Sequence, residues 1–197
     1  MQENIPENKV SVFFVDQDGE WIYNRENLNP RPEITFLPLP RDRSDLDNWL
    51  DDEAATETVV SEQALGIALN ILTNGWRQRA NDRNEPAPVD NSNSCKFATI
   101  LVKTIFGGTI EGNYDHQYNV IDGVIIDLNK DCDDVITLKE KKQNPYRHDS
   151  IFFQSEDHLD SMLSCIPRIA TWLSTVALSE HQNLDKEVQS KKNRPRI

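Results

Sequence analysis

The chain has 197 residues, 33 of them acidic and 21 basic, and a formal net charge of −12. Its length suits one domain with a core of its own, while an apolar content of 37% leaves much of the chain for surface and loops. The acidic balance argues against a direct nucleic-acid binder, because neutralising phosphates requires clustered Lys and Arg. The same charge suits solubility, or docking on a basic partner.

The sequence shows neither a membrane span nor an export signal. No apolar run approaches the roughly 20 residues that a bilayer span needs, so we expect no membrane association. Residues 1–9 are polar and lack the pattern of a signal peptide, which predicts a cytoplasmic protein and leaves export without a signal open. The three cysteines, Cys95, Cys132 and Cys165, are odd in number and fit no zinc spacing, which argues against a disulfide framework or a zinc site.

Residues 1–43 are predicted to form an N-terminal attachment that packs on the main domain. Alternating apolar residues around an Asp-Gly turn signal predict a β-hairpin over residues 10–24. The four prolines that follow indicate an extended connection, in which residues 34–37 are a candidate short strand. We place the main domain at residues 44–179.

The segment 44–57 sets two apolar residues, Trp49 and Leu50, among six acidic ones. Either a short exposed helix or a loop fits this pattern. An isolated aromatic side chain among acids is typical of an anchor on a contact surface, where the acids would attract a basic partner. A helix that tucks Trp49 into its own core fits equally well.

Two helices are predicted in the middle of the chain. The first begins after Ser61 as N-cap and carries apolar residues at helical spacing from Leu65 to Trp76. Gly75 marks where it should fray, and the polar stretch 77–93 is predicted to be a loop. The second helix begins after Ser94, which we expect to cap it, and ends at a Gly-Gly pair.

Toward the C-terminus, residues 149–153 are predicted to form a strand. A long amphipathic helix begins at Ser155, and Pro167 should kink it. Residues 180–197 lack apolar periodicity and are predicted to be a charged, mobile tail.

A strand at 109–113 and a hairpin of 116–121 with 124–129 lie between the helices. A two-residue turn at Asp122-Gly123 places Tyr118 opposite Asp127 and His116 opposite Asn129, so that all four side chains share one face of the sheet. Asp127 is then diagonal to His116, where a carboxylate can orient an imidazole, and Asn129 is the competing orienter.

Cys95 lies in the first turn of its predicted helix, where free N–H groups and the helix dipole favour a thiolate and could hold an oxyanion. With His116 and Asp127 it forms the set of a nucleophilic cysteine enzyme. Asn93 and Ser94, which precede the cysteine, are candidate oxyanion donors beside Asn129.

The segment from Cys95-Lys96-Phe97-Ala98 through Gly107-Gly108, His116-Gln117-Tyr118-Asn119 and Asp127-Leu128 resembles the core of bacterial transglutaminase-like (papain-like) cysteine proteins. Asn129 stands where that family has a Thr. The resemblance covers about residues 60–153. It implies an α+β fold with a papain/transglutaminase-like core, in which a Cys-bearing helix packs on an antiparallel sheet, and the N-terminal hairpin and C-terminal helix are additions.

The resemblance also implies a function: a thiol-dependent acyl-transfer enzyme acting on amide bonds, as a peptidase, deamidase or transglutaminase. The expected catalytic residues are Cys95, His116 and Asp127, with a protein or peptide substrate and no cofactor or metal. The alternative is a non-enzymatic acidic binding protein on the same fold, of the inhibitor, immunity or DNA-mimic type, which docks on a basic partner.

Two weaker patterns compete with this interpretation. Alternating acidic and amide residues from Asp127 to Asp133 are similar to a calcium loop, but Cys132 and Leu138 occupy the positions of its glycine and its bidentate Glu. His148, followed by Asp149, is a rival imidazole for which a surface position is the simpler explanation.

Overall fold

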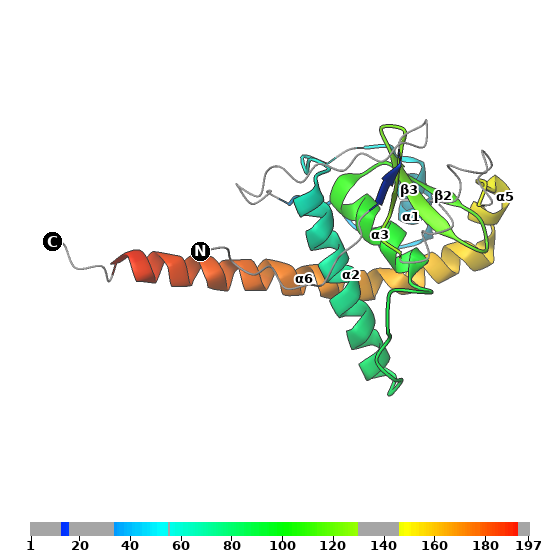
Figure 1. Ribbon diagram of the computed structural model, residues 1–197. Coiled ribbons are helices and arrows are strands. Elements are labelled where there is room, and N and C mark those ends of the chain that lie inside the picture. Colours follow the sequence, from blue (N-terminus) through cyan, green and yellow to red (C-terminus); the bar gives the residue numbers. More distant parts are fainter. Residues whose placement is uncertain (1–12, 16–33, 55, 130–145, 193–197) are drawn as a thin grey trace.

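Figure 1 shows the computed structural model of the chain, which describes residues 13–15, 34–54, 56–129 and 146–192. A small antiparallel sheet of strand order β1-β4-β3-β2 packs against the helical part of the molecule, and the α+β class is confirmed. The strands are β1 (Phe13–Val15), β2 (Thr109–Gly112), β3 (Gln117–Ile121) and β4 (Val124–Asp127). The helices are α1 (Arg43–Asp51), α2 (Glu62–Asp82), α3 (Cys95–Phe106), α5 (Ser150–Phe153) and α6 (Glu156–Lys192).

Helix α3 is the centre of the fold. All nine residues from Ala98 to Phe106 are buried, and the helix contacts α2 and α6 as well as β2, β3 and β4. A helix that is covered on every side is held by packing rather than by its own propensity. This packing holds residues 98–106 against the sheet, and Cys95 lies about one turn before them, at the first residue of the helix.

A buried lysine binds backbone carbonyl groups near the C-terminal end of α3. Lys103 is fully buried, and its Nζ donates to the backbone carbonyls of Asp52 (2.6 Å) and Gly108 (2.5 Å). Burial lowers the pKa of Lys103, against the attraction of nearby acids such as Asp52 and Glu53. The ammonium thus joins the end of α1 to the end of α3.

Most of the acidic segment is a helix and not a loop, because residues Arg43–Asp51 form α1. The Asp42 carboxylate caps it by accepting from the Asp45 N–H at 3.0 Å. Trp49 is only 8% exposed, and its ring lies 5.2 Å from Lys103 Nζ. The indole belongs to the core, so the interpretation of Trp49 as an exposed anchor is wrong.

Helix α2 begins as predicted and ends later. The Ser61 hydroxyl accepts from the Ala64 N–H at 3.2 Å, which confirms the cap. The helix continues past Gly75 to Asp82 because Gly75 lies against Trp172 of α6, where a Cβ would come within 2.2 Å of the indole. Asp82 is also paired with Arg168 of α6 at 2.6 Å. The predicted fraying at Gly75 and loop at residues 77–82 are wrong, because packing on α6 extends the helix.

The central hairpin has the predicted register. Ile121 pairs with Val124 across a turn in which Asp122 and Gly123 have φ values of 51° and 78°. Strand β1 pairs with β4 and places Phe13 opposite Asp127. The turn and second strand of the predicted N-terminal hairpin lie outside the described residues.

Two predicted strands are absent from the described part of the chain. Residues 34–37 form no strand, and the Leu37 N–H donates to the Thr104 carbonyl of α3 at 2.7 Å instead of to another strand. Residues 150–153 are helix α5, because the Asp149 carboxylate accepts from the N–H groups of Ile151 (3.0 Å) and Phe152 (3.2 Å) and so caps a helical turn.

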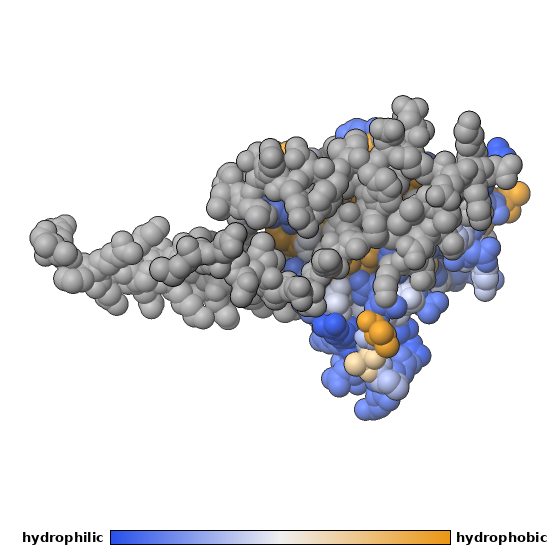
Figure 2. Space-filling model, in the orientation of Figure 1, coloured by the Kyte–Doolittle hydropathy of each residue, from blue (hydrophilic) through white to orange (hydrophobic). Residues whose placement is uncertain are grey.

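Helix α6 starts after Ser155, as predicted, and is continuous across Pro167 as far as Lys192. Residues 180–192, predicted to be a tail, are therefore helical, and Figure 1 shows this end projecting beyond the rest of the fold. In Figure 2 the coloured surface is mainly hydrophilic. None of the described helices is both long enough and apolar enough to cross a membrane.

Candidate active site

A tight turn between β2 and β3 places His116 directly before the first residue of β3. Gly112, at the end of β2, has a φ of 115°, and a Cβ on it would lie 2.2 Å from the His116 carbonyl oxygen. The Asn113 side chain accepts from the N–H groups of Asp115 (2.9 Å) and His116 (3.3 Å). Glycine is thus needed at position 112 for His116 to reach its place.

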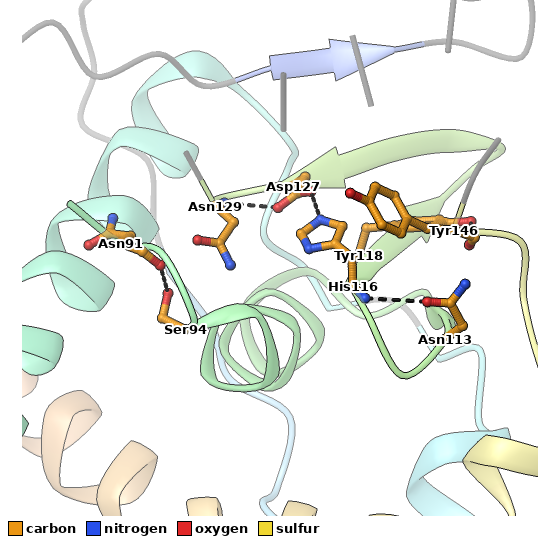
Figure 3. Close-up of polar contacts among 8 residues, drawn as sticks. All are labelled: Asn91, Ser94, Asn113, His116, Tyr118, Asp127, Asn129 and Tyr146. Atoms are coloured by element: carbon orange, nitrogen blue, oxygen red, sulfur yellow. Dashed lines mark hydrogen bonds and ion pairs between the residues drawn. The ribbon is translucent and has the colours of Figure 1, made fainter. Parts of the chain in front are cut away.

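His116 and Asp127 form the buried pair that the hairpin geometry predicts. The His116 Nε2 lies 2.5 Å from the Asp127 Oδ2 (Figure 3), and the two side chains are 6% and 3% exposed. The second carboxylate oxygen, Oδ1, accepts from the Asn129 backbone N–H at 2.8 Å. Both oxygens of Asp127 are therefore engaged, and the carboxylate is fixed in orientation.

The environment of His116 favours its protonated form. Burial lowers the pKa of the imidazole, but the hydrogen bond and charge of Asp127, with a smaller effect from the Cys95 side chain, raise it from 6.5 to about 10. Since Nε2 is occupied by Asp127, Nδ1 is the ring nitrogen left for Cys95. A carboxylate thus holds an imidazolium beside the cysteine at neutral pH.

Cys95 is the first residue of α3 and is half-buried. With the Asn129 amide oriented so that both of its polar atoms find partners, Asn129 Oδ1 accepts from the Cys95 backbone N–H at 2.8 Å, and Nδ2 donates to the Asn91 carbonyl. The first N–H of the helix is therefore occupied by Asn129. This differs from the expectation that this N–H stands free for an oxyanion.

The other candidate oxyanion and orienting residues have different roles from those expected. Ser94 is fully buried, and its hydroxyl donates to the Asn91 carbonyl at 2.6 Å instead of capping α3. Asn93 has an exposed side chain and a φ of 64°. Asn129 joins the site, but it contacts Asp127 and Cys95 rather than the imidazole.

Three residues around the site were not predicted from the sequence. The Tyr146 ring lies 4.8 Å from the His116 ring, and the Tyr118 hydroxyl donates to the Tyr146 carbonyl at 3.3 Å. The remaining two are Asn91 and Asn113, and the Asn-x-Asp pattern at 113–115 is a turn signal that could have been found.

The described residues support neither His148 as an alternative imidazole nor the calcium-like pattern. His148 is exposed and stacks on Phe153 at 5.0 Å, while the carboxylate of Asp149 caps α5 and does not orient an imidazole. In the described ranges no group of three or more His, Cys, Asp or Glu side chains could hold a metal ion. Positions 130–138 of the calcium-like pattern, with Cys132, lie outside those ranges.

Cys165 lies in surroundings different from those of Cys95. It is 5% exposed, its sulfur donates to the Ser161 carbonyl at 3.3 Å, and burial raises the pKa of its thiol. Between these two cysteines, only Cys95 lies beside a charged imidazole.

No family model, curated protein or solved structure matches this chain.

Proposed function

We propose that the protein is a thiol-dependent acyl-transfer enzyme acting on amide bonds, with Cys95 as nucleophile, His116 as general base and acid, and Asp127 as orienter of the imidazole. The observation that carries the proposal is the buried His116–Asp127 pair, 2.5 Å between Nε2 and Oδ2, on a histidine that also interacts with the Cys95 side chain. Burying a charged pair costs free energy. A role in activating the neighbouring cysteine would explain why the fold contains such a pair.

The reaction follows from the roles of the three groups. The Cys95 thiolate attacks the amide carbonyl and forms a carbon–sulfur bond. His116 gives its proton to the departing amine as the carbon–nitrogen bond breaks, which leaves a thioester on Cys95. His116 then takes a proton from water or from an acceptor amine, whose attack breaks the carbon–sulfur bond, releases the acyl group and restores the Cys95 thiolate beside the protonated His116.

The proposal extends to the fold and to the substrate. The order of α3, β2, β3 and β4, with the cysteine starting the helix and the histidine and aspartate on adjacent antiparallel strands, supports a papain/transglutaminase-like core. A protein or peptide substrate of basic character would suit the net charge of −12.

The test combines a peptide library with site variants. We expect wild-type protein to produce cleaved, deamidated or cross-linked peptides, detected by mass spectrometry, and to trap an acyl group on Cys95. Cys95→Ala should abolish both while keeping the fold, because Ala preserves a small side chain at the helix start. Cys165→Ala is the matched control and should leave both intact. Products that persist in Cys95→Ala would overturn the proposal.

A further inference from the structure

The nucleophile and its base lie on separate elements of the fold. His116 and Asp127 sit on the β3–β4 hairpin, whereas Cys95 starts α3. Acyl transfer needs the sulfur held close to the imidazole, and a misplacement of 1 Å can cost about a hundredfold in rate. Something must therefore hold the start of α3 against the end of β4.

Asn129 touches both sides of this junction. It follows β4 directly after Leu128 and is 2% exposed. Its backbone N–H donates to Asp127 Oδ1 at 2.8 Å, its side-chain oxygen accepts from the Cys95 N–H at 2.8 Å, and its amide nitrogen donates to the Asn91 carbonyl. One residue thus binds the orienting carboxylate, the backbone of the nucleophile and the loop before the helix.

The local sequence of α3 does not supply this connection. Ser94 occupies the N-cap position without a side-chain capping bond, because its hydroxyl donates to the Asn91 carbonyl. The Cys95 N–H is satisfied from the far end of the hairpin instead, by a residue 34 positions later in the chain. A helix capped only by local residues could shift relative to the sheet, whereas this one is tied to the Asp127 end of β4.

We propose that Asn129 is a positioning residue, which keeps the Cys95 sulfur in line with His116 by holding the Cys95 backbone N–H and the Asp127 carboxylate together. The proposal rests on the proposed function, since a position matters only if Cys95 and His116 react together. It also assigns the Cys95 N–H to positioning rather than to stabilising an oxyanion.

The test uses iodoacetamide alkylation of Cys95, followed by mass spectrometry between pH 5 and 9, together with the NMR titration of His116. In Asn129→Ala we expect the rate at pH 6 to fall about tenfold and the pKa of His116 to fall, because the sulfur drifts from the imidazole. Asn129→Ser, whose hydroxyl cannot reach both Cys95 and Asn91, gives the same readouts if Asn129→Ala does not fold.

Asn119→Ala is the matched control. It removes another buried amide that joins the hairpin to α3, at Thr99 in the middle of the helix, and it should leave the pH profile of Cys95 unchanged. An unchanged or higher rate in the folded Asn129 variants would overturn this proposal alone. If wild-type Cys95 itself reacts at pH 6 no faster than an ordinary thiol, the proposed function fails, and this proposal fails with it.

Discussion

The molecule buries two histidines in opposite ways. His116 is 5% exposed and bound to Asp127, and its pKa is raised to about 10. His158 on α6 is 3% exposed, neither of its ring nitrogens has a partner among the described residues, and burial with a smaller effect of the Lys96 charge lowers its pKa to about 4.

Burial therefore does not decide the charge of an imidazole in this fold; the partner does. Around His158 the neighbours are the rings of Phe152 and Phe153, at 4.2 Å and 4.9 Å. Around His116 they are a carboxylate with both oxygens fixed and a cysteine. One imidazole is a neutral part of the core, and the other is equipped to move protons.

The largest effect should come from making His116 resemble His158. Asp127→Asn removes the counter-charge and leaves burial opposed by the Cys95 side chain alone, so we expect the pKa of His116 to fall well below 10. Alkylation of Cys95 at pH 6 should then slow by roughly a hundredfold or more, the usual range for a lost acid–base partner.

Asp149→Asn is the control for that substitution, because its amide oxygen can still cap α5. It should leave Cys95 as reactive as in the wild type. If Cys95 is equally reactive in Asp127→Asn and in wild type, the Asp127 carboxylate has no part in activating Cys95. The contrast between His116 and His158 would then have no bearing on reactivity.

His158 should make the fold sensitive to acid. Its pKa is near 4 in the folded chain and about 6.5 in the unfolded chain. The unfolded state thus takes up a proton first, and stability is lost as the pH falls from 6.5 toward 4. The loss from pH 7 to pH 5 should be about 2 kcal/mol.

Urea unfolding at the two pH values measures this loss, and His158→Phe should remove it by keeping a ring that never ionises. His148→Phe is the control, since His148 also contacts the Phe153 ring but is exposed. The same pH dependence in His158→Phe and wild type would mean that His158 is not the acid-sensitive group.

The sign is reversed for His116. Its pKa is higher in the folded chain, so its contribution to stability is complete below pH 6.5 and is lost as the pH rises toward 10. Unfolding measured between pH 7 and 10 should show this alkaline loss in wild type and not in Asp127→Asn. If the stability of Asp127→Asn also falls between pH 7 and pH 10, groups other than His116 cause the loss.

The smallest effect concerns the ring that covers His116. A cation over an aromatic face gains about 1 kcal/mol, or about fivefold in an equilibrium, and Tyr146 lies 4.8 Å away. Tyr146→Ala should therefore lower the pKa of His116, measured by NMR titration, by about 0.7, whereas Tyr146→Phe should leave it close to the wild-type value. A fall as large as that in Asp127→Asn would show that Tyr146 does more than contact the ring.

The sequence predicts the parts of the site that depend on local rules. A two-residue turn fixes which residues face each other, so the His116–Asp127 pair follows from counting outward from Asp122-Gly123. The start of α2 after Ser61 follows from capping in the same way, and α3 begins where predicted although Ser94 does not cap it. These features need no knowledge of the rest of the fold.

What the sequence does not reveal depends on distant neighbours. Gly75 looks like a helix breaker, yet it lies against Trp172, which is 97 positions later. The apolar run after Asp149 is too short to separate a strand from a capped turn. Nothing near Asn129 indicates that its side chain binds the Cys95 N–H, because that contact exists only once α3 packs against the hairpin.

One titration tests the comparison most directly: the imidazole ¹⁵N signals of the four histidines, followed by NMR from pH 4 to pH 10. We expect His116 to keep its proton to about pH 10 and His158 to stay neutral to about pH 4. If both instead titrate near 6.5, then the His116–Asp127 pair does not hold an imidazolium beside Cys95, and the proposed chemistry loses the charged acid that should pair with the Cys95 thiolate.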